Sequence, residues 1–392
     1  MVAVVHCRNK RTRRLIKSPH LLPQTGIDTL LKDRNQIEFL KGKRVALLAN
    51  QSSVTSEFTS SAYALQDLIG PSLVSLFTME HGWSAFCAAG EEIKNTQEPH
   101  TKLPIYSLYG PLFKENLPLL KSIDILIIDI QDVGVRCYTY IATCAKVLEY
   151  SALENCPLEF IVCDRPNPLG QATRGPGFNA EHRSLVNYID VPFQHGETIG
   201  TLLKYHNNSL KNPRALTVIP SLSPIYPDRT AWIPPSPGLP DWEATFLYPG
   251  LVLLEGTNIS EGRGSSLPFK CVAAPLLDFM KIIEVLNGIP QSGIKARPFS
   301  FIPESGKLSG QLCHGAQIHI TDYEKVNGFL IGVYLLNTLF HSYPTFEWTY
   351  THNKYWIDEL TGSPCFREAI EKGYSSQEIF ESCNENTYQI KY

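Results

Sequence analysis

Four short, continuously apolar runs alternate with amphipathic stretches in the first half of the chain, and this alternation restricts the fold more than any other feature of the sequence. Apolar runs of this length are typical of strands buried on both faces of a sheet. Strands alternating with helices predict a doubly wound, mostly parallel α/β sheet. The predicted strands cover 44–50, 72–79, 124–130 and 159–164, and the predicted helices cover 58–70 and 138–152.

Each predicted strand ends in polar side chains. In open parallel sheets, ligands bind in the crevice beyond the carboxyl ends of the strands, so we expect these side chains to line one edge of the sheet. In strand order they are Asn50 and Gln51, Glu80 and His81, Asp129 to Asp132, and Asp164 and Arg165.

The length of the chain, 392 residues, exceeds what one hydrophobic core usually holds, so we expect two domains. We place the first domain at 26–189 and a second α/β (α+β) domain at 190–392. In the second domain we predict helices at 196–207 and 327–343, strands at 215–220, 248–258 and 314–322, and an ordered, proline-rich loop at 233–242.

The first 25 residues include the basic stretch KRTRRLIK at 10–17. A secretory signal would continue with an apolar segment of seven or more residues, but Ser18, Pro19 and His20 follow instead. We therefore interpret residues 1–25 as a disordered or processed tail and expect a cytoplasmic protein, with an exported or periplasmic one as the alternative. Ten cysteines without a CxxC pair favour free, reduced thiols over disulfides.

Charge and motif content exclude several classes of protein. The net charge is -3, and basic residues cluster only at the start, so we expect no nucleic-acid partner. The sequence contains no run of 18 apolar residues, so we predict no membrane-spanning helix. The signatures GxxxxGK[ST], GxGxxG, HExxH and GxSxG are absent, so we expect no metal and no cofactor. The sequence does not indicate the oligomeric state.

The turn MEHGW at 79–83 holds the first candidate for chemistry. Glu80, at the end of a strand, can be held partly desolvated against Trp83 and Phe86, as a general acid requires. Alternatively, Glu80 caps the next helix and His81 packs beneath it.

A second candidate is the stretch IDIQDVGVRCYTY at 128–140. Two carboxylates, an amide and a guanidinium leave a buried strand here through a VG turn, on Asp129, Gln131, Asp132 and Arg136. The structural alternative is an ion pair between Asp132 and Arg136, four residues apart. Asp129 lies within an apolar run and therefore needs a hydrogen-bonded role, whether catalytic or supporting.

Two loops provide further candidates for ligand binding. Asp164 and Arg165 precede two prolines, in a rigid loop that either faces a ligand or is only a turn. His195 precedes a predicted helix start, where an anion or a sugar hydroxyl can bind, or where the ring merely caps and packs.

The glycine-rich stretch 254–266 is dense in hydrogen-bonding groups, as in loops that bind polyhydroxylated ligands. It contains Glu255, Asn258, Glu261 and Arg263, and the arginine can bind a carboxylate through two hydrogen bonds. Aromatic residues that can hold sugar rings, among them Trp83 and Tyr138, lie near these clusters. Paired carboxylates, aromatic rings and an arginine favour glycoside chemistry.

Seven motifs occur in the same order as in the NamZ-type exo-β-N-acetylmuramidase family, which the chain resembles from about Gly26 to its last residue. They are LLANQSSVT, MEHGWSAFCAAGEEI, IIDIQDVGVRCYTYI, DRPNPLG, PFQHGETIGTL, WIPPSPGLP and YPGLVLLEGTNISEGRGSSLPF. The resemblance implies a Rossmann-like N-terminal domain packed on an α/β C-terminal domain, with the active site in the cleft between them. It also implies release of N-acetylmuramic acid from the non-reducing end of peptidoglycan fragments, in cell-wall turnover or recycling.

The resemblance also implies roles for individual residues. Glu80 becomes the leading candidate for general acid or base, with His81 orienting it. Six further residues would supply the second carboxylate or grip the sugar and its lactyl carboxylate: Asp129, Asp132, Arg136, Glu255, Glu261 and Arg263.

This chain departs from the family directly after the EHG turn. Family members usually continue with an aromatic residue, an arginine and a glycine, whereas this chain has Trp83, Ser84 and Ala85. We favour a working glycosidase with altered specificity. A non-catalytic muropeptide-binding relative is the alternative, and a Rossmann-type cofactor enzyme is a third hypothesis that only the fold supports.

Overall fold

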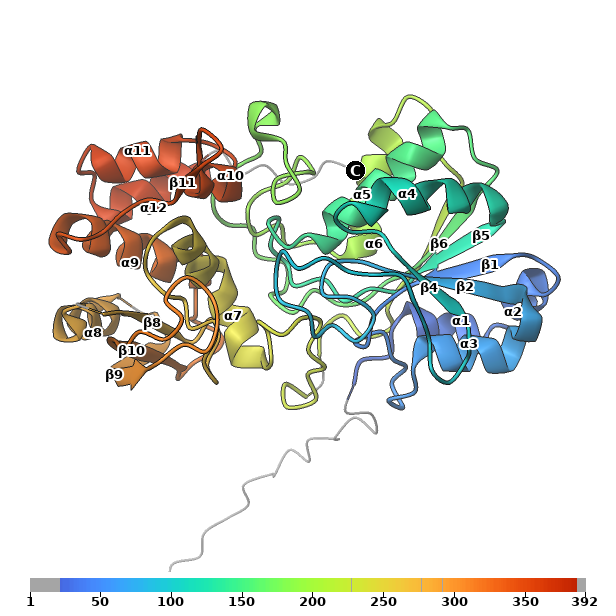
Figure 1. The fold of residues 1–392 in the computed structure, drawn as a ribbon, viewed down its shortest axis with the longest axis horizontal. Coiled ribbons are helices and arrows are strands. Elements are labelled where there is room, and N and C mark those ends of the chain that lie inside the picture. The colour runs from blue at the N-terminus through green and yellow to red at the C-terminus, as the bar shows by residue number, and fades with distance from the viewer. Residues whose placement is uncertain (1–21, 227, 276, 291, 386–392) are drawn as a thin grey trace, which may run out of the picture.

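The chain folds into two lobes that lie side by side (Figure 1). The computed structural model describes residues 22–226, 228–275, 277–290 and 292–385. Most of the expected basic tail, residues 1–21, lies outside these ranges. Its last residues are part of the fold, because Leu22 is buried and the backbone N–H of Thr25 donates to Asp28 in the first helix.

The N-terminal lobe is built on a seven-stranded sheet in the order β3-β4-β2-β1-β5-β6-β7. All neighbouring strands are parallel except β3 and β4. The expected doubly wound, mostly parallel sheet is therefore confirmed. The strands are β1 (Val45–Leu48), β2 (Leu73–Thr78), β3 (Thr96–Gln97), β4 (Pro104–Ser107), β5 (Ile125–Ile128), β6 (Glu159–Cys163) and β7 (Leu216–Ile219).

Helices cover both faces of this sheet (Figure 1). Alternate residues of a strand point to opposite faces, so Val45 and Leu47 of β1 enter one core cluster and Ala46 and Leu48 enter the other. The first face carries α1 (Gly26–Lys32), α2 (Arg34–Leu40) and α3 (Ser61–Ile69), and the second carries α4 (Leu112–Asn116), α5 (Tyr140–Leu153) and α6 (Ile199–Ser209).

The first lobe extends further along the chain than the sequence predicted. We expected the second domain to begin at residue 190, but β7 lies beyond that point and pairs in parallel with β6. The helix before it, α6, packs on α5 of the same lobe. The N-terminal lobe therefore continues at least to Ile219, because β7 completes its sheet.

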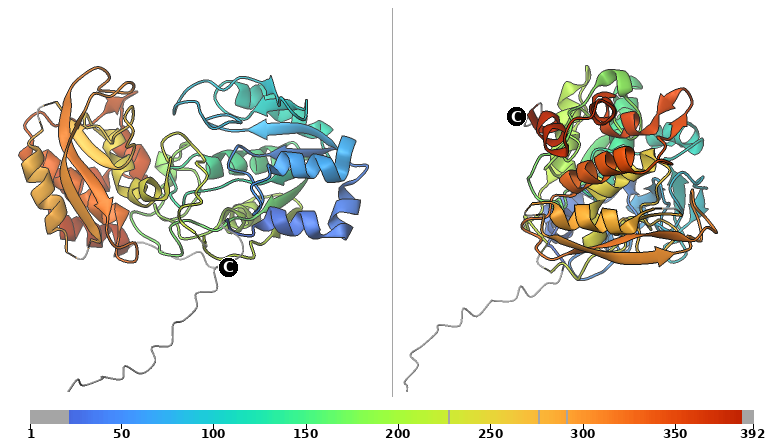
Figure 2. Two further views of the ribbon diagram at one scale, coloured as in Figure 1. Left: turned by 90° about the horizontal axis from the view of Figure 1, so that it is seen from below. Right: turned by 90° about the vertical axis from the view of Figure 1, so that its left-hand side faces the viewer.

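The C-terminal lobe is built around the antiparallel sheet β8-β10-β9 (Figure 2). Helices α7 and α9 pack against each other, and α8 packs on α9 and the sheet. The strands are β8 (Cys271–Ala274), β9 (Ile294–Phe301), β10 (Cys313–Ile320), β11 (Tyr350–Thr351) and β12 (Lys354–Tyr355). The helices are α7 (Trp242–Leu251), α8 (Phe279–Gly288), α9 (Gly328–Ser342), α10 (Trp356–Thr361), α11 (Cys365–Glu371) and α12 (Ser376–Glu385).

One element prediction in this lobe is wrong. We expected a strand at 248–258, but the chain there completes α7 and continues as the 3-10 helix η4 (Val252–Gly256). Asp241 starts α7 by accepting a hydrogen bond from the backbone N–H of Ala244. A helix that is apolar all round has the same continuous apolar sequence as a buried strand, so the periodicity cannot separate the two.

Glycine allows α7 and α9 to pack in close contact. A Cβ on Gly250 would lie 2.0 Å from the carbonyl oxygen of Gly328, and one on Gly332 would lie 2.6 Å from the Cα of Gly250. No side chain fits at this crossing. Packed against α9 in this way, α7 and the following η4 form the wall of the C-terminal lobe that faces the N-terminal lobe.

Candidate active site

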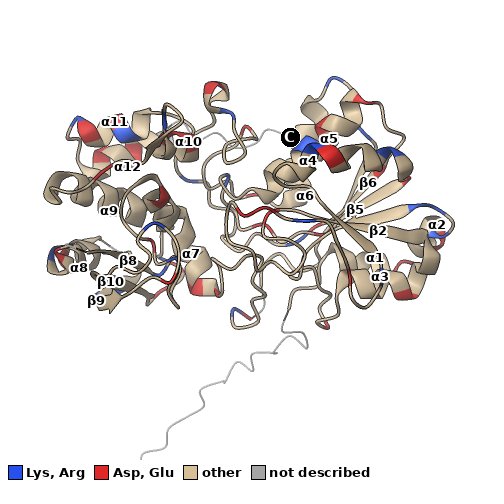
Figure 3. Cartoon of the chain, viewed as in Figure 1, with Lys and Arg blue, Asp and Glu red and all other residues tan. Residues whose placement is uncertain are grey.

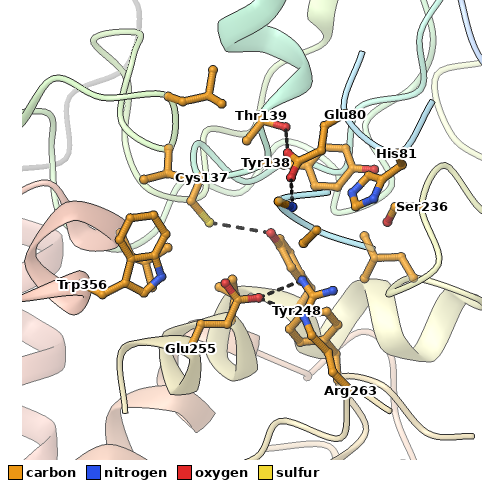
Figure 4. Close-up of a pocket in the computed structure, with 18 of the residues that line it drawn as sticks. Glu80, His81, Cys137, Tyr138, Thr139, Ser236, Tyr248, Glu255, Arg263 and Trp356 are labelled. Carbon is orange, nitrogen blue, oxygen red and sulfur yellow. Dashed lines mark hydrogen bonds and ion pairs between the residues drawn. The ribbon is translucent and has the colours of Figure 1, made fainter. Parts of the chain in front are cut away.

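A cavity of about 430 Å³ lies between the lobes, and both contribute to its walls (Figure 4). The N-terminal lobe provides residues that follow β2 and precede α5, and the C-terminal lobe provides α7, η4 and the start of α10. The labelled residues of this cavity are Glu80, His81, Cys137, Tyr138, Thr139, Ser236, Tyr248, Glu255, Arg263 and Trp356.

Glu80 enters the cavity from the turn after β2. The backbone reverses sharply here, with positive φ angles of 70° at His81 and 76° at Gly82. One carboxylate oxygen of Glu80 accepts hydrogen bonds from the backbone N–H of Gly90 (3.0 Å) and the hydroxyl of Tyr109 (2.8 Å), and the other accepts one from the hydroxyl of Thr139. Three donors from three segments fix the orientation of this carboxylate.

The surroundings of Glu80 differ from those expected. Phe86 is 75% exposed, and Trp83 packs against the core on the other face of the sheet, so neither desolvates the carboxylate. The shielding comes instead from the turn itself and from Tyr109 and Thr139, and Glu80 is 7% exposed. Burial and the adjacent Glu80 raise the pKa of the Tyr109 hydroxyl, which therefore remains a donor.

His81 lies beside Glu80 but does not orient it as expected. Its Nδ1 is 2.7 Å from the carbonyl oxygen of Cys87 and must donate to it, so in the neutral ring Nε2 is an acceptor. Burial lowers the pKa of His81, although the Cys87 carbonyl and Glu80 oppose this shift. His81 therefore lines the cavity as a neutral imidazole near pH 7.

The opposite wall carries a second carboxylate, Glu255 of η4. Arg263 donates to it through Nη2 (2.8 Å) and Nε (3.2 Å), and the same Nε lies 3.6 Å from Glu261. Burial raises the pKa of Glu255, while the charge of Arg263 works against this rise. The guanidinium also lies 4.8 Å from the ring centroid of Phe269.

Aromatic and apolar side chains complete the cavity. Tyr138 and Tyr248 meet edge to face, with ring centroids 6.1 Å apart, and Trp356 forms another part of the wall (Figure 4). The proline-rich loop 233–242 covers one side and contributes Ser236. A row of rings beside two carboxylates is a suitable surface for a sugar.

Asn50, at the end of β1, holds that loop in place rather than lining the cavity. Its Nδ2 donates to the hydroxyl of Tyr140 (3.0 Å) and to the carbonyl of Pro235 (3.3 Å), and Tyr140 donates to the same carbonyl. The prolines and these bonds keep the loop ordered, as the sequence predicted.

Asp129 is fully buried and lies outside the cavity. Arg165 donates to both of its oxygens, from Nε at 2.6 Å and from Nη2 at 2.9 Å, and Ser61 donates to one of them. The negative charge of Asp129 and the positive charge of Arg165 thus compensate each other at the edge of the sheet. The structure does not place these two candidates in contact with a ligand in the cavity.

Asp132 forms no ion pair with Arg136. It accepts instead from the backbone N–H of Gly134 (2.7 Å) and from Nε2 of His195 (3.1 Å), whose Nδ1 accepts from the backbone N–H of Glu197. His195 is 1% exposed, so the packing alternative describes it correctly.

Arg136 connects the two lobes. It is 1% exposed and donates to the carbonyl oxygens of Val191 (2.6 Å) and Pro176 (3.1 Å) in its own lobe and of Thr361 (2.7 Å) at the end of α10. Burial lowers its pKa to about 10. This residue is therefore structural, although the sequence placed it among the substrate-binding residues.

The remaining candidates also support the fold. Asp164 accepts from the backbone N–H of Gly200 and the hydroxyl of Thr198, which fixes the start of α6. Gln131 accepts from Tyr226, Asn258 donates to the carbonyl of Thr345, and Glu261 pairs with Lys307 at 3.1 Å. Five of the predicted residues line the cavity: Glu80, His81, Tyr138, Glu255 and Arg263.

Tyr109, Thr139 and Trp356 are among the cavity residues that the sequence interpretation missed. Thr139 was within a quoted motif, but its polar side chain gave no sign of contact with Glu80, 59 positions earlier. Tyr109 follows β4 and Trp356 begins α10, and neither belongs to a recognisable local pattern.

The described part of the chain contains no cluster of three or more His, Cys, Asp or Glu residues arranged to hold a metal ion. Within it, no helix is long and apolar enough to cross a membrane. Lys and Arg are interspersed with Asp and Glu over both lobes (Figure 3).

Comparisons with known proteins cover both lobes. Models of the family described as exo-beta-N-acetylmuramidase NamZ match residues 45–243 with the N-terminal domain and 246–391 with the C-terminal domain. The chain is 39% identical over 374 residues to the peptidoglycan beta-N-acetylmuramidase NamZ of Bacillus subtilis (strain 168), covering 94% of this chain and 89% of that protein.

Two crystal structures of DUF1343 family proteins from Bacteroides fragilis NCTC 9343 have the same fold. Their TM-scores are 0.79 and 0.71, at 28% and 27% identity, and the matches cover 95% and 93% of this chain and 100% and 95% of theirs. Because both domain models match and the Bacillus subtilis relative matches over most of the chain, this chain belongs to the exo-β-N-acetylmuramidase NamZ family.

Proposed function

We propose that this protein is an exo-β-N-acetylmuramidase that releases terminal N-acetylmuramic acid from the non-reducing end of peptidoglycan fragments, in cell-wall turnover or recycling. The observation that carries the proposal is the position of Glu80, which three donors hold at a cavity that Glu255 lines from the other lobe. The family membership of the chain supports the same activity.

Two carboxyl groups are what glycoside hydrolysis requires. One protonates the glycosidic oxygen as the C1–O bond breaks, and the other acts at the opposite face of the sugar, either on C1 or on the attacking water. We assign the proton transfer to Glu80 and the second role to Glu255. We no longer include Asp129 and Asp132 in the catalytic pair, because neither of them lines the cavity.

The other cavity residues suit a sugar ring. Neutral His81 presents Nε2 as an acceptor for a hydroxyl group, and Tyr138, Tyr248 and Trp356 provide apolar faces. The volume of about 430 Å³ falls in the range of roughly 300–1,000 Å³ that is usual for small-molecule sites.

The test uses chromogenic β-glycosides of N-acetylmuramic acid and N-acetylglucosamine together with a muramic-acid-terminated disaccharide. We expect release from the two muramyl compounds and detection of free N-acetylmuramic acid by mass spectrometry. The anomer formed first, observed by proton NMR, separates retention from inversion. Replacing Glu255 by Gln should lower kcat for both muramyl compounds, and unchanged kcat would remove Glu255 from the pair.

The absence of the family arginine favours a second candidate, a non-catalytic binding protein. Ser84, at that position, is exposed and does not line the cavity. Tight binding of a muropeptide by calorimetry without cleavage over days would establish this candidate and contradict the enzyme.

We also propose that the protein works in a reducing compartment such as the cytoplasm. The nine cysteines within the described residues are free thiols, and seven of them are buried. Free thiols of this kind are typical of reducing compartments. Cell fractionation with thiol labelling would test this, and recovery of the protein only outside the membrane would contradict it.

A further inference from the structure

A side pocket of about 290 Å³ opens next to the main cavity, in the N-terminal lobe. The two cavities share Gly90, Tyr109 and Leu185, so a ligand can extend from one to the other past Tyr109. The proposed catalytic pair does not reach into this space. Its other lining residues are Leu108, Gly110, Phe113, Thr143 and Lys146.

Lys146 lies in this side pocket, and no acidic residue that the structure describes forms an ion pair or hydrogen bond with it. Its Nζ is 4.0 Å from the ring centroid of Phe113, and it has no ion pair or hydrogen bond with any residue the structure describes. Glu149, one turn further along α5, is bound instead by Arg183 (2.6 Å), His206 (3.0 Å) and Tyr188. The charge of Lys146 is therefore half-buried and available to a ligand.

The main cavity offers no free cation of its own. Arg263 is bound by Glu255 and lies against Glu261, and the lowered pKa of His81 keeps its ring neutral. Glu80 and Glu255 both repel an anion. Among the described residues that line the two cavities, Lys146 is therefore the one lysine or arginine without an ion-pair partner. An acidic group on the substrate can reach it.

The helix α5 sets the distance between Lys146 and Glu80. Thr139, which donates to Glu80, directly precedes this helix, and Thr143 and Lys146 follow at spacings that keep all three on one helix face. Seven residues span roughly 10 Å along a helix. A sugar residue and one substituent cover a distance of this order.

We propose that Lys146 binds the carboxylate on the muramyl residue of the substrate, either the free lactyl group or an acid of the peptide attached to it. The proposal rests on the proposed function and deepens it, because it names the residue that separates muramyl from N-acetylglucosaminyl substrates. The ammonium group of Lys146 lies over the ring of Phe113 and pairs with the carboxylate across the side pocket.

The test compares Lys146→Met with the wild type on three chromogenic muramides: the free lactyl acid, its lactyl methyl amide, and the derivative carrying an acidic dipeptide. The control variant is Lys114→Met, which removes an exposed neighbouring lysine that lines neither cavity. Losing a charge-assisted hydrogen bond should raise KM for the acidic substrates roughly tenfold to a hundredfold, with kcat little changed.

The three substrates distinguish the source of the carboxylate. A raised KM on the lactyl acid alone assigns Lys146 to the lactyl group, and one on the dipeptide alone assigns it to the peptide. Lys146→Arg should restore most of the loss. Equal kinetics of Lys146→Met and wild type, or an equal loss on the neutral amide, would overturn the proposal. An inactive wild type on all three muramides would instead reject the proposed function.

Discussion

Glu80 and Asp129 are two acidic residues with nearly the same position in the fold and different surroundings. They follow β2 and β5, the two strands that flank β1, and they are 7% and 0% exposed. Asp129 is neutralised by Arg165, whereas Glu80 accepts only from uncharged donors and lines a cavity. Of these two strand-end carboxylates, the one paired with a cation therefore supports the fold, and the one without a cation lines the cavity.

The strongest test of this comparison is the removal of the Glu80 charge. Glu80→Gln keeps the shape of the side chain and should lower kcat/KM on a muramide about 10²-fold to 10⁴-fold, because proton transfer is lost. Thermal unfolding and ligand binding should stay close to wild type. Activity within a factor of three of wild type would reject Glu80 as the proton-transfer residue.

The matching change at Asp129 should act on stability instead. Asp129→Ala leaves Arg165 buried without its partner, which should cost about 3–5 kcal/mol of unfolding free energy. Urea unfolding followed by circular dichroism measures this cost. Wild-type stability of Asp129→Ala together with a loss of turnover like that of Glu80→Gln would contradict the assignment of Asp129 as structural and Glu80 as catalytic.

Unfolding measured over a series of pH values tests whether the His81 ring, next to Glu80, is neutral in the folded protein. Burial lowers the pKa of His81, so the unfolded chain binds this proton more readily than the folded protein. The contribution of His81 to the unfolding free energy is therefore present above about pH 6.5. It is lost as the pH falls through the pKa that His81 has in the folded protein.

The measurement is the difference in unfolding free energy between wild type and His81→Asn at pH 7.5, 6.5 and 5.5. We expect the advantage of wild type to shrink toward pH 5.5. Because other groups titrate in both proteins, only the difference is used. An advantage that grows on acidification has the opposite sign and would mean that the ring is charged in the folded state.

The smallest expected effect concerns the backbone of the turn after Glu80. Ala85 has a φ of 47°, a conformation that favours glycine. Ala85→Gly should raise the unfolding free energy by at most about 1 kcal/mol, because the gain in the folded state is offset by a more flexible unfolded chain. Turnover should not change.

The matched control is Ala88→Gly, which lies in the same turn but has no positive φ. It should be neutral or slightly destabilising in denaturant unfolding. Equal effects of the two substitutions would show that Ala85 is unstrained.

Features set by short stretches of sequence were predictable. The apolar runs gave the sheet, and the expected strand at 314–322 and helix at 327–343 are present as β10 and α9. The run at 248–258 was misjudged because a helix buried on all sides has no polar face to reveal its period. The place of Glu80 in the site followed from its position at the end of a strand and from the family resemblance.

Features that depend on distant partners were not predictable. Whether Asp129 or Asp132 was available for chemistry depended on Arg165 and His195, 36 and 63 positions away. The donors that hold Glu80 come from three separate segments. Residue type and spacing identify groups able to do chemistry, but only the folded chain shows which of them already have a partner.

The contact between Arg136 and Thr361 has a consequence for how a substrate enters. A hinge motion that parted the lobes would remove one carbonyl acceptor from a fully buried cation, at a cost of roughly 1.5–3 kcal/mol. At that cost an opened form makes up no more than about a tenth of the molecules. Substrate capture should then be a single bimolecular step without a slow closing phase, and crystals of the free protein should accept soaked sugars without cracking.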